Sequence, residues 1–156
     1  MKGIDELLAE HELFAGLDQA TLSLLAGCAS NVVFDPGQQL FVEGGPADRF
    51  WIIRHGRVAL QVTVPGAGPM TVETLGSGAV VGWSWFVPPY RWRFDATAVE
   101  VTRATVFDVG CVRAKMDQDP RVGYQLLSRF VPVIVDRLQA TRLRLLDVYS
   151  VPTRGI

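Results

Sequence analysis

Short runs of apolar residues fill the middle of the chain, and longer helical patterns flank them on both sides. Between residues 31 and 109 these runs are rich in Val, Ile, Thr, Phe and Trp, and turn residues such as Pro36-Gly37 and His55-Gly56 separate them. Such runs between turn residues predict β-strands. The expected strands are residues 31–34, 38–43, 49–54, 57–64, 70–75, 79–82, 95–101 and 104–109. About eight short strands at this spacing predict a double-stranded β-helix, the jelly-roll barrel.

Apolar residues at intervals of three and four predict helices on both sides of this barrel. Residues 4–29 are expected to form two helices, because Gly16 interrupts the pattern and Asp18 suits the N-cap of the second. A short helix is expected at 112–119 and a long one at 121–149, in which Pro132 should produce a kink. The predicted fold class is α+β. The boundaries expected for this single domain of residues 1–156 are N-terminal helices in 1–30, the β-roll in 31–110 and C-terminal helices in 111–150.

Composition excludes several classes of protein. Hydrophobic residues make up 49% of the 156-residue chain, which suits a packed core and argues against disorder. No apolar run reaches the roughly 20 residues that span a bilayer, and the N-terminus lacks a signal-peptide core. We therefore expect a cytoplasmic protein without a membrane partner. Cys28 and Cys111 are far apart in sequence, so we expect two small buried side chains rather than a disulfide or a zinc site.

The sequence contains no pattern typical of catalysis or metal binding. His11 and His55 have no acidic partner at ligand spacing. The nucleophile-elbow, P-loop and dinucleotide-binding motifs do not occur. We therefore expect no enzyme activity, no catalytic residue and no metal.

Several motifs together resemble the cyclic nucleotide-binding domain of the catabolite-activator/Fnr (Crp/Fnr) superfamily. They lie at residues 13–17 (LFAGL), 34–41 (FDPGQQLF), 43–48 (EGGPAD), 51–58 (WIIRHGRV) and 76–82 (GSGAVVG). The resemblance covers nearly the whole chain. It implies the jelly-roll fold and a regulatory role in signal transduction.

The same resemblance implies a ligand site in residues 76–97. In the family, a Glu after the second glycine holds the ribose, and an Arg about ten residues later pairs with the cyclic phosphate. Trp83 and Phe94 stand at these two positions here, and Arg93 lies one residue away. In a strand, that shift turns the Arg93 side chain to the opposite face unless a bulge intervenes. We therefore expect cyclic AMP binding to be lost or altered, and no resident cofactor.

Two arrangements of this aromatic stretch remain open. Trp83, Trp85 and Phe86 fold inward and fill the roll, or they line a pocket for a flat or anionic ligand. In the second arrangement Arg91 or Arg93 lies at the mouth of the pocket. Ser84 is a hydrogen-bond donor in both. The candidate ligand-binding residues are Gly82, Trp83, Ser84, Arg91, Arg93 and Phe94.

The long helix carries apolar residues at alternating intervals of three and four. This seam predicts a parallel homodimer and resembles the dimerisation helix of the family. In the alternative, the same residues cover the β-roll of their own chain. From Pro120 onward there are six Arg and two Asp, which suits either a solvated helix face or contact with an acidic partner or phosphates. The candidate interface residues are Ile134, Leu138, Thr141, Leu145 and Val148.

These observations predict a regulatory or scaffold module. One alternative is a small-ligand sensor of the Crp/Fnr type. Another is a subunit of a larger complex that uses the roll as a protein-interaction surface, marked by exposed Trp85, Tyr90 and Trp92. The sequence ends at Ile156, without length for a winged helix-turn-helix, so we expect no direct sequence-specific DNA binding. A DNA-associated role through a separate partner is the last alternative.

Overall fold

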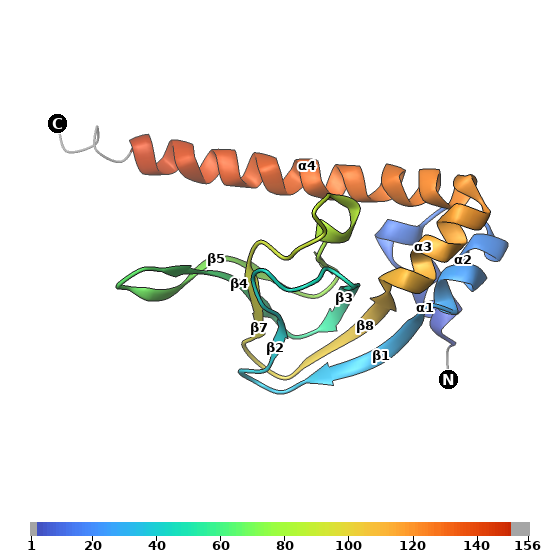
Figure 1. Cartoon of the computed structure of the whole chain (residues 1–156), viewed down its shortest axis with the longest axis horizontal. Helices are drawn as coiled ribbons and strands as arrows, with labels where there is room; N and C mark the ends of the chain where they lie inside the picture. The colour runs from blue at the N-terminus through green and yellow to red at the C-terminus, as the bar shows by residue number, and fades with distance from the viewer. Residues whose placement is uncertain (1–2, 151–156) are drawn as a thin grey trace.

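Two four-stranded antiparallel sheets form the body of the protein (Figure 1). The computed structural model describes residues 3–150, with side chains through residue 147. The first sheet has the strand order β1-β8-β3-β6 and the second β2-β7-β4-β5. The strands are β1 (Ala29–Phe34), β2 (Gln39–Phe41), β3 (Arg49–His55), β4 (Val58–Val64), β5 (Gly68–Leu75), β6 (Val80–Val81), β7 (Asp95–Ala98) and β8 (Thr102–Asp108). All eight predicted strands are present, and the jelly-roll fold class is confirmed.

Helices precede and follow the roll as the sequence predicts. They are α1 (Ile4–Ala9), η1 (Glu12–Phe14) and α2 (Gln19–Ala26) before it, a short η2 (Ser84–Phe86) within it, and α3 (Val109–Gln118) and α4 (Pro120–Ser150) after it. Helix α4 runs along one side of the roll and over the β4–β5 hairpin (Figure 1). It is a single helix of 31 residues that continues through Pro132.

The two faces of β3 show how the core is divided. Phe50 stacks on Phe107 of β8 and meets Phe130 of α4 edge-on, so this face of the sheet is covered by helices. The next residue, Trp51, contacts Phe41 of β2 in the opposite sheet. Successive side chains of a strand point to opposite faces. The buried core therefore has two connected layers, one inside the roll and one between the roll and its helices.

Residue 28 and residue 111 form a disulfide, and the prediction of two separate buried thiols is wrong. The Cys28–Cys111 sulfur atoms are 2.07 Å apart across a sequence separation of 83 residues. Antiparallel pairing of β1 with β8 sets Ala29 opposite Phe107. This pairing brings the start of β1 beside the end of β8, where α3 begins. Long-range strand pairing, which the cysteine spacing does not reveal, explains the error.

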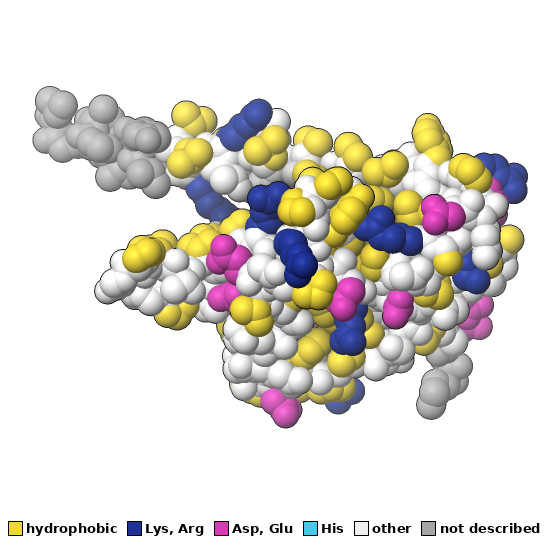
Figure 2. All heavy atoms as spheres, viewed as in Figure 1, with side chains coloured by type: hydrophobic (Ala, Val, Ile, Leu, Met, Phe, Trp, Pro, Cys, Tyr) yellow, Lys and Arg dark blue, Asp and Glu magenta, His cyan; other side chains and the backbone are white. Residues whose placement is uncertain are grey.

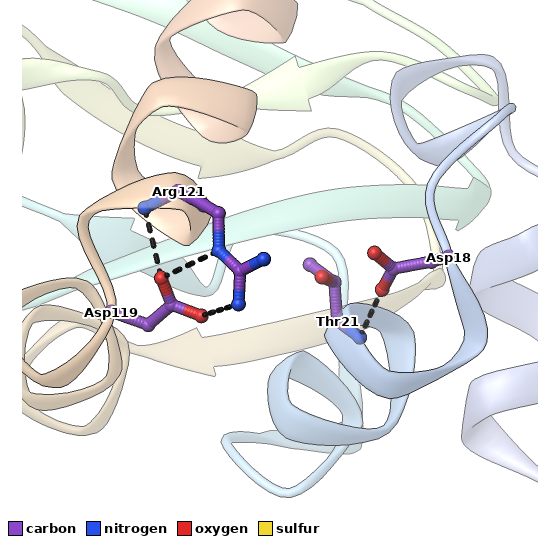
Figure 3. A network of polar contacts seen from close by, with 4 residues as sticks. All are labelled: Asp18, Thr21, Asp119 and Arg121. Carbon is purple, nitrogen blue, oxygen red and sulfur yellow. Dashed lines mark hydrogen bonds and ion pairs between the residues drawn. The ribbon is translucent and has the colours of Figure 1, made fainter.

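Two aspartates that lie near each other in space cap the starts of two helices (Figure 3). The Asp18 carboxylate accepts a hydrogen bond from the Thr21 amide at 2.7 Å, which confirms its predicted N-cap role in α2. The Asp119 carboxylate, just before α4, accepts from the Arg121 amide and pairs with its guanidinium at 3.1 Å. Hydrogen bonds from Thr21 lower the pKa of Asp18, and hydrogen bonds from Arg121 lower that of Asp119. Both helices therefore begin at charged caps.

Candidate ligand site

The predicted ligand stretch forms the connection from β6 to β7. It leaves β6 at Gly82, whose φ of 96° is one that only glycine adopts readily, and makes the single turn η2. It returns through the cis Pro88-Pro89 bond and through Tyr90, at φ 59°. In Figure 1 the η2 turn lies directly against α4. The stretch is therefore placed between the roll and the long helix.

The side chains of η2 point away from the interior of the roll. Trp85 is fully buried, and its ring stacks on Phe50 at 5.1 Å and meets Phe130 edge-on at 5.6 Å. Phe86 stacks on Trp85 and also contacts Phe130. The arrangement in which Trp85 and Phe86 fold inward is therefore wrong. Phe50 of β3 and Phe130 of α4 pack with these rings in the core beneath the helix.

Trp92 fills the space inside the roll instead. Its side chain is 5% exposed and stacks on Phe41 of β2, with ring centroids 3.9 Å apart and planes 10° apart. A Cβ built at Gly82 would lie 2.7 Å from Cη2 of Trp92, so the indole reaches the backbone of the candidate site. Sequence analysis missed this role and listed Trp92 only as a surface residue. Its one sequence signal is its place between two arginines, Arg91 and Arg93, in an alternating pattern.

The two arginines of the stretch lie on the surface. Arg91 forms an isolated β-bridge with Pro46 and donates to the Gly44 carbonyl at 3.3 Å. Arg93 is exposed and, among the residues that the structure describes, has no hydrogen-bond or ion-pair partner. Phe94 is 38% exposed, because residues 93 and 94 form a bend before β7 begins. Neither Arg93 nor Phe94 belongs to a strand. The expectation that a one-residue shift turns the Arg93 side chain to the opposite face of a strand therefore does not apply.

The surface patch predicted for a complex subunit is also missing from this stretch. Trp85 and Trp92 are buried, and of the three residues only Tyr90, at 41%, is exposed. Exposure of Trp85, Tyr90 and Trp92 is expected to mark a subunit of a larger complex, and burial of the two tryptophans contradicts this expectation.

Trp83 connects the candidate site to α4. The guanidinium carbon of Arg137, in the middle of α4, lies 4.5 Å from the centre of the half-buried Trp83 ring. Arg137 also donates a hydrogen bond to the Val80 carbonyl of β6. Burial lowers the pKa of Arg137, and the charge of Glu73 opposes this shift. Ser84 is half-buried at the start of η2, where it accepts a backbone hydrogen bond from Val87.

A residue that sequence analysis did not identify supports the same stretch from α3. The guanidinium of Arg113 donates to the Trp85 carbonyl and lies 4.4 Å from the centre of the Tyr90 ring. Arg113 therefore contacts the stretch on both sides of its Pro-Pro corner. Nothing local in the sequence around Arg113 signals this contact, since Arg113 follows Tyr90 by 23 positions and both β7 and β8 lie between them.

Two further arginines attach α4 to the rest of the protein. Arg129 donates to the Ala15 carbonyl, near the N-terminal helices. Arg144 donates to the Val72 carbonyl of β5 at 2.7 Å. Together with Arg137 they occupy one face of the helix at intervals of eight and seven residues. The basic residues of α4 thus include a group that holds the helix against its own chain.

The predicted seam of α4 lies mostly on the outer face of the helix. Leu138 and Leu145 are 48% and 53% exposed, Thr141 is exposed, and Ile134 is half-buried. The side chain of Val148 lies outside the described residues. The same spacing continues toward the start of α4 through three more exposed residues, Tyr124, Leu127 and Val131. Figure 2 shows hydrophobic side chains along this outer edge. The alternative in which the seam covers its own roll is therefore contradicted for Leu138 and Leu145.

A recess of about 310 Å³ lies elsewhere on the molecule. It is formed between α1 and β3, and its lining includes Leu7, His11, Ile52, Arg54 and Gly78. The His11 Nε2 atom lies 2.7 Å from the Gly78 carbonyl oxygen beside it. None of the predicted ligand-binding residues lines this recess.

Two further features are absent from the described residues, 3–150. The described side chains contain no group of three or more His, Cys, Asp or Glu that could hold a metal ion. No helix in this part of the chain is long and apolar enough to cross a membrane.

Comparison with known proteins places this geometry in context. The family model for the cyclic nucleotide-binding domain matches residues 31–119. A CRP-like cAMP-activated global transcriptional regulator from Mycobacterium tuberculosis is 28% identical over 152 residues. That alignment covers 97% of this chain, and the chain spans 66% of the length of the regulator.

Solved structures show the same fold. A cyclic nucleotide-binding domain from Methylobacillus flagellatus superposes with a TM-score of 0.78 at 21% identity, covering 93% of this chain and 82% of that one. The N-terminal domain of a transcriptional regulator from Streptomyces coelicolor gives a TM-score of 0.66 at 25% identity, covering 89% and 94%. The fold is therefore shared with these proteins over 93% and 89% of this chain.

Proposed function

The chain belongs to the cyclic nucleotide-binding domain family, and we propose that it is a regulatory module in which ordinary cyclic AMP binds weakly or not at all. Its output in this proposal is the position or pairing of α4 rather than a chemical reaction. Its relative in M. tuberculosis is a cAMP-activated regulator. In this proposal the protein has a regulatory role and a cytoplasmic location, but its response to cyclic AMP is weakened or lost.

The observation that carries this proposal is the position of Trp92. Its indole stacks on Phe41 and reaches the backbone of Gly82, so a nucleotide entering the roll would have to displace it. Removing a large aromatic side chain from a core costs about 3–5 kcal/mol. The chain also has Trp83 and Phe94 in place of a carboxylate and a guanidinium, and each lost charge-assisted hydrogen bond costs roughly 1.5–3 kcal/mol. Together these terms weaken binding by several orders of magnitude.

Calorimetric titration with cyclic AMP and cyclic GMP tests the proposal. We expect no saturable heat from the wild-type protein up to millimolar nucleotide, while the M. tuberculosis regulator serves as the positive control. The informative variants are Trp92→Ala, which empties the space, and Trp92→Ala combined with Trp83→Glu and Phe94→Arg, which also supplies the polar groups. Binding by the triple variant alone would show that these three positions close the site. A micromolar affinity in the wild-type protein would refute the proposal.

We further propose that the protein acts as a parallel homodimer through α4. The support is the exposed apolar seam, which runs from Tyr124 through Leu138 to Leu145 at coiled-coil spacing. An exposed stripe of this length on a helix is typical of a surface that another protein covers. Light scattering at tens of micromolar protein measures the assembly directly. A monomeric mass at that concentration would contradict the dimer and would favour a different protein partner for the seam.

A sensor for another small anion is the second candidate function. One observation favours it: Arg93 is exposed and, among the described residues, unpaired, and it is adjacent to Trp92 in the chain. A thermal-shift screen of nucleotides and organic phosphates would detect such a ligand. Stabilisation that disappears in Arg93→Gln but not in Arg103→Gln, an exposed arginine on β8, would support this candidate. Equal loss in both variants would indicate nonspecific charge attraction.

A further inference from the structure

We propose that the Cys28–Cys111 disulfide is a reversible redox site that sets how firmly α3 is held against the roll. The proposal rests on the proposed cytoplasmic regulatory role, because disulfides in reducing compartments are usually transient and redox-sensing. The sequence contains no other cysteine, so this pair has no competing partner within the chain. The crosslink therefore has two states, oxidised and reduced.

The two sulfur atoms differ in access. Cys28 is 7% exposed, beneath the N-terminal helices, whereas Cys111 is half-buried in the first turn of α3. An incoming thiolate must reach a sulfur atom along the line of the disulfide bond, so access decides which sulfur it attacks. Cys111 is therefore the sulfur that an external thiol attacks, and Cys28 is the leaving group.

The exchange balances with a low-molecular-weight thiol or a protein dithiol as the reductant. Its thiolate attacks Sγ of Cys111, the disulfide bond breaks, and Cys28 leaves as a thiolate that takes up a proton. The mixed disulfide on Cys111 is then resolved by a second reductant thiolate, which releases the oxidised reductant and the Cys111 thiol. The protein gains two electrons and two protons, and the two reductant thiols become one disulfide.

The structural consequence follows from what α3 contacts. Arg113, two residues after Cys111, holds the Trp85 carbonyl and the Tyr90 ring. Further along α3, Met116 packs on Gly123 of α4. Opening the disulfide removes the covalent anchor of α3, while the Asp108 cap and two backbone hydrogen bonds at residues 108 and 109 remain. Reduction therefore loosens α3 and, through Arg113, the stretch between η2 and Tyr90, without unfolding the roll.

Thiol counting and hydrogen exchange test this proposal on the full chain. The oxidised protein should show no titratable thiol, and millimolar dithiothreitol should expose both cysteines and lower the Tm by about 10 °C. Amide exchange should rise in residues 109–118 and 84–92 and stay unchanged in the β4–β5 hairpin, which the crosslink does not touch. The Cys28→Ser/Cys111→Ser variant should match the reduced protein and ignore dithiothreitol.

Three results would overturn the proposal. If the disulfide resists millimolar dithiothreitol under native conditions, it is a permanent structural crosslink. If both thiols remain free after mild oxidation, no crosslink forms. A rise in exchange confined to residues 28 and 111 would contradict the link through Arg113. None of these measurements involves a nucleotide. The redox proposal and the proposed loss of cyclic AMP binding can therefore fail independently of each other.

Discussion

At the scale of single residues, Gly82 and Trp92 depend on each other. The indole of Trp92 lies where a side chain at residue 82 would be, and the positive φ of Gly82 aims that empty position at the ring. Gly82 is therefore required both for its backbone conformation and for the space that it leaves. Few substitutions at either residue should be compatible with the present core.

The variants Gly82→Ala and Gly37→Ala separate these two effects. Both glycines have positive φ, but nothing lies within 4 Å of a Cβ at Gly37, whereas Cη2 of Trp92 lies 2.7 Å from one at Gly82. The backbone conformation alone costs about 1–2 kcal/mol, and overpacking against the ring adds roughly 1–3 kcal/mol. Urea unfolding should therefore show a clearly larger loss of stability in Gly82→Ala. Equal losses would mean that the ring moves aside freely.

The same residues show how far sequence reasoning reaches. Turns with positive φ can be predicted at Gly37, Gly44, Gly56 and Gly78, because such turns depend on local chemistry, and all four glycines have positive φ. One of the two arrangements left open by the sequence fills the roll with Trp83, Trp85 and Phe86, and neither uses Trp92, although all four are large aromatic residues in one irregular stretch. Which ring enters the roll depends on the bend at residues 93 and 94 and on the competing core beneath α4. Neither of these is visible in a local pattern.

At the scale of elements, α4 has one face that is buried against the rest of the protein and one that is exposed. One face buries Val122, Leu126 and Phe130 against the rest of the protein, and the other exposes the seam that includes Leu138 and Leu145. The seam follows a heptad spacing, whereas the last fully buried residue of α4 among the described residues is Phe130. The sequence leaves open whether the seam residues pair with a second chain or cover their own roll, and in the structure different residues of α4 cover the rest of the protein.

Leu138→Glu tests the outer face, with Gln139→Glu as a matched control of equal charge on the next residue. Leu138 is 48% exposed in the single chain, so the substitution should not disturb folding. In a dimer it would bring two carboxylates together in an apolar seam, which should weaken association by at least about 100-fold. Sedimentation should show a monomer for Leu138→Glu and an unchanged dimer for Gln139→Glu. A dimer in both variants would place the interface elsewhere.

The charged caps of α2 and α4 predict a response to acid. Hydrogen bonds hold the pKa of Asp18 and of Asp119 below the ordinary value of 3.8. A carboxylate with a lowered pKa stabilises the fold above its ordinary pKa, and this contribution is lost as the pH falls through the lowered value. The Asp18→Asn/Asp119→Asn variant keeps acceptor oxygens at both caps, so its stability should fall less than wild type below pH 3.8. Identical acid unfolding curves would assign the response to other carboxylates.

At the scale of the whole molecule, contacts from distant parts of the chain hold α4 and α3 on the roll. Arg129, Arg137 and Arg144 join α4 to the N-terminal region, to β6 and to β5 in turn. The disulfide joins α3 to the start of β1. Sequence reasoning gave the order of the elements but none of these connections, because each joins residues at least 57 positions apart. Periodicity carries no information about such pairs.

The variants Arg137→Ala and Arg142→Ala compare an arginine that attaches α4 to the roll with a nearby exposed arginine on the same helix. Loss of Arg137 leaves the Val80 carbonyl without its donor and uncovers the Trp83 ring, which should cost about 1–3 kcal/mol. Arg142 is exposed and, among the described residues, has no hydrogen-bond or ion-pair partner, so its removal should change stability little. Hydrogen exchange should increase along α4 beyond residue 133 only in Arg137→Ala. Similar exchange in both variants would show that apolar packing alone holds the helix.

The burial of Trp85 has an optical consequence. Its indole lies between the roll and α4 with Nε1 enclosed and without a hydrogen-bond partner among the described residues. An indole in such dry surroundings emits at shorter wavelengths than one in water, and lifting of α4 would admit water to this ring before the roll opens around Trp51 and Trp92. The protein therefore contains its own fluorophore for movement of the long helix. A red shift that precedes loss of the β-sheet circular dichroism signal would record that movement in real time, without any label.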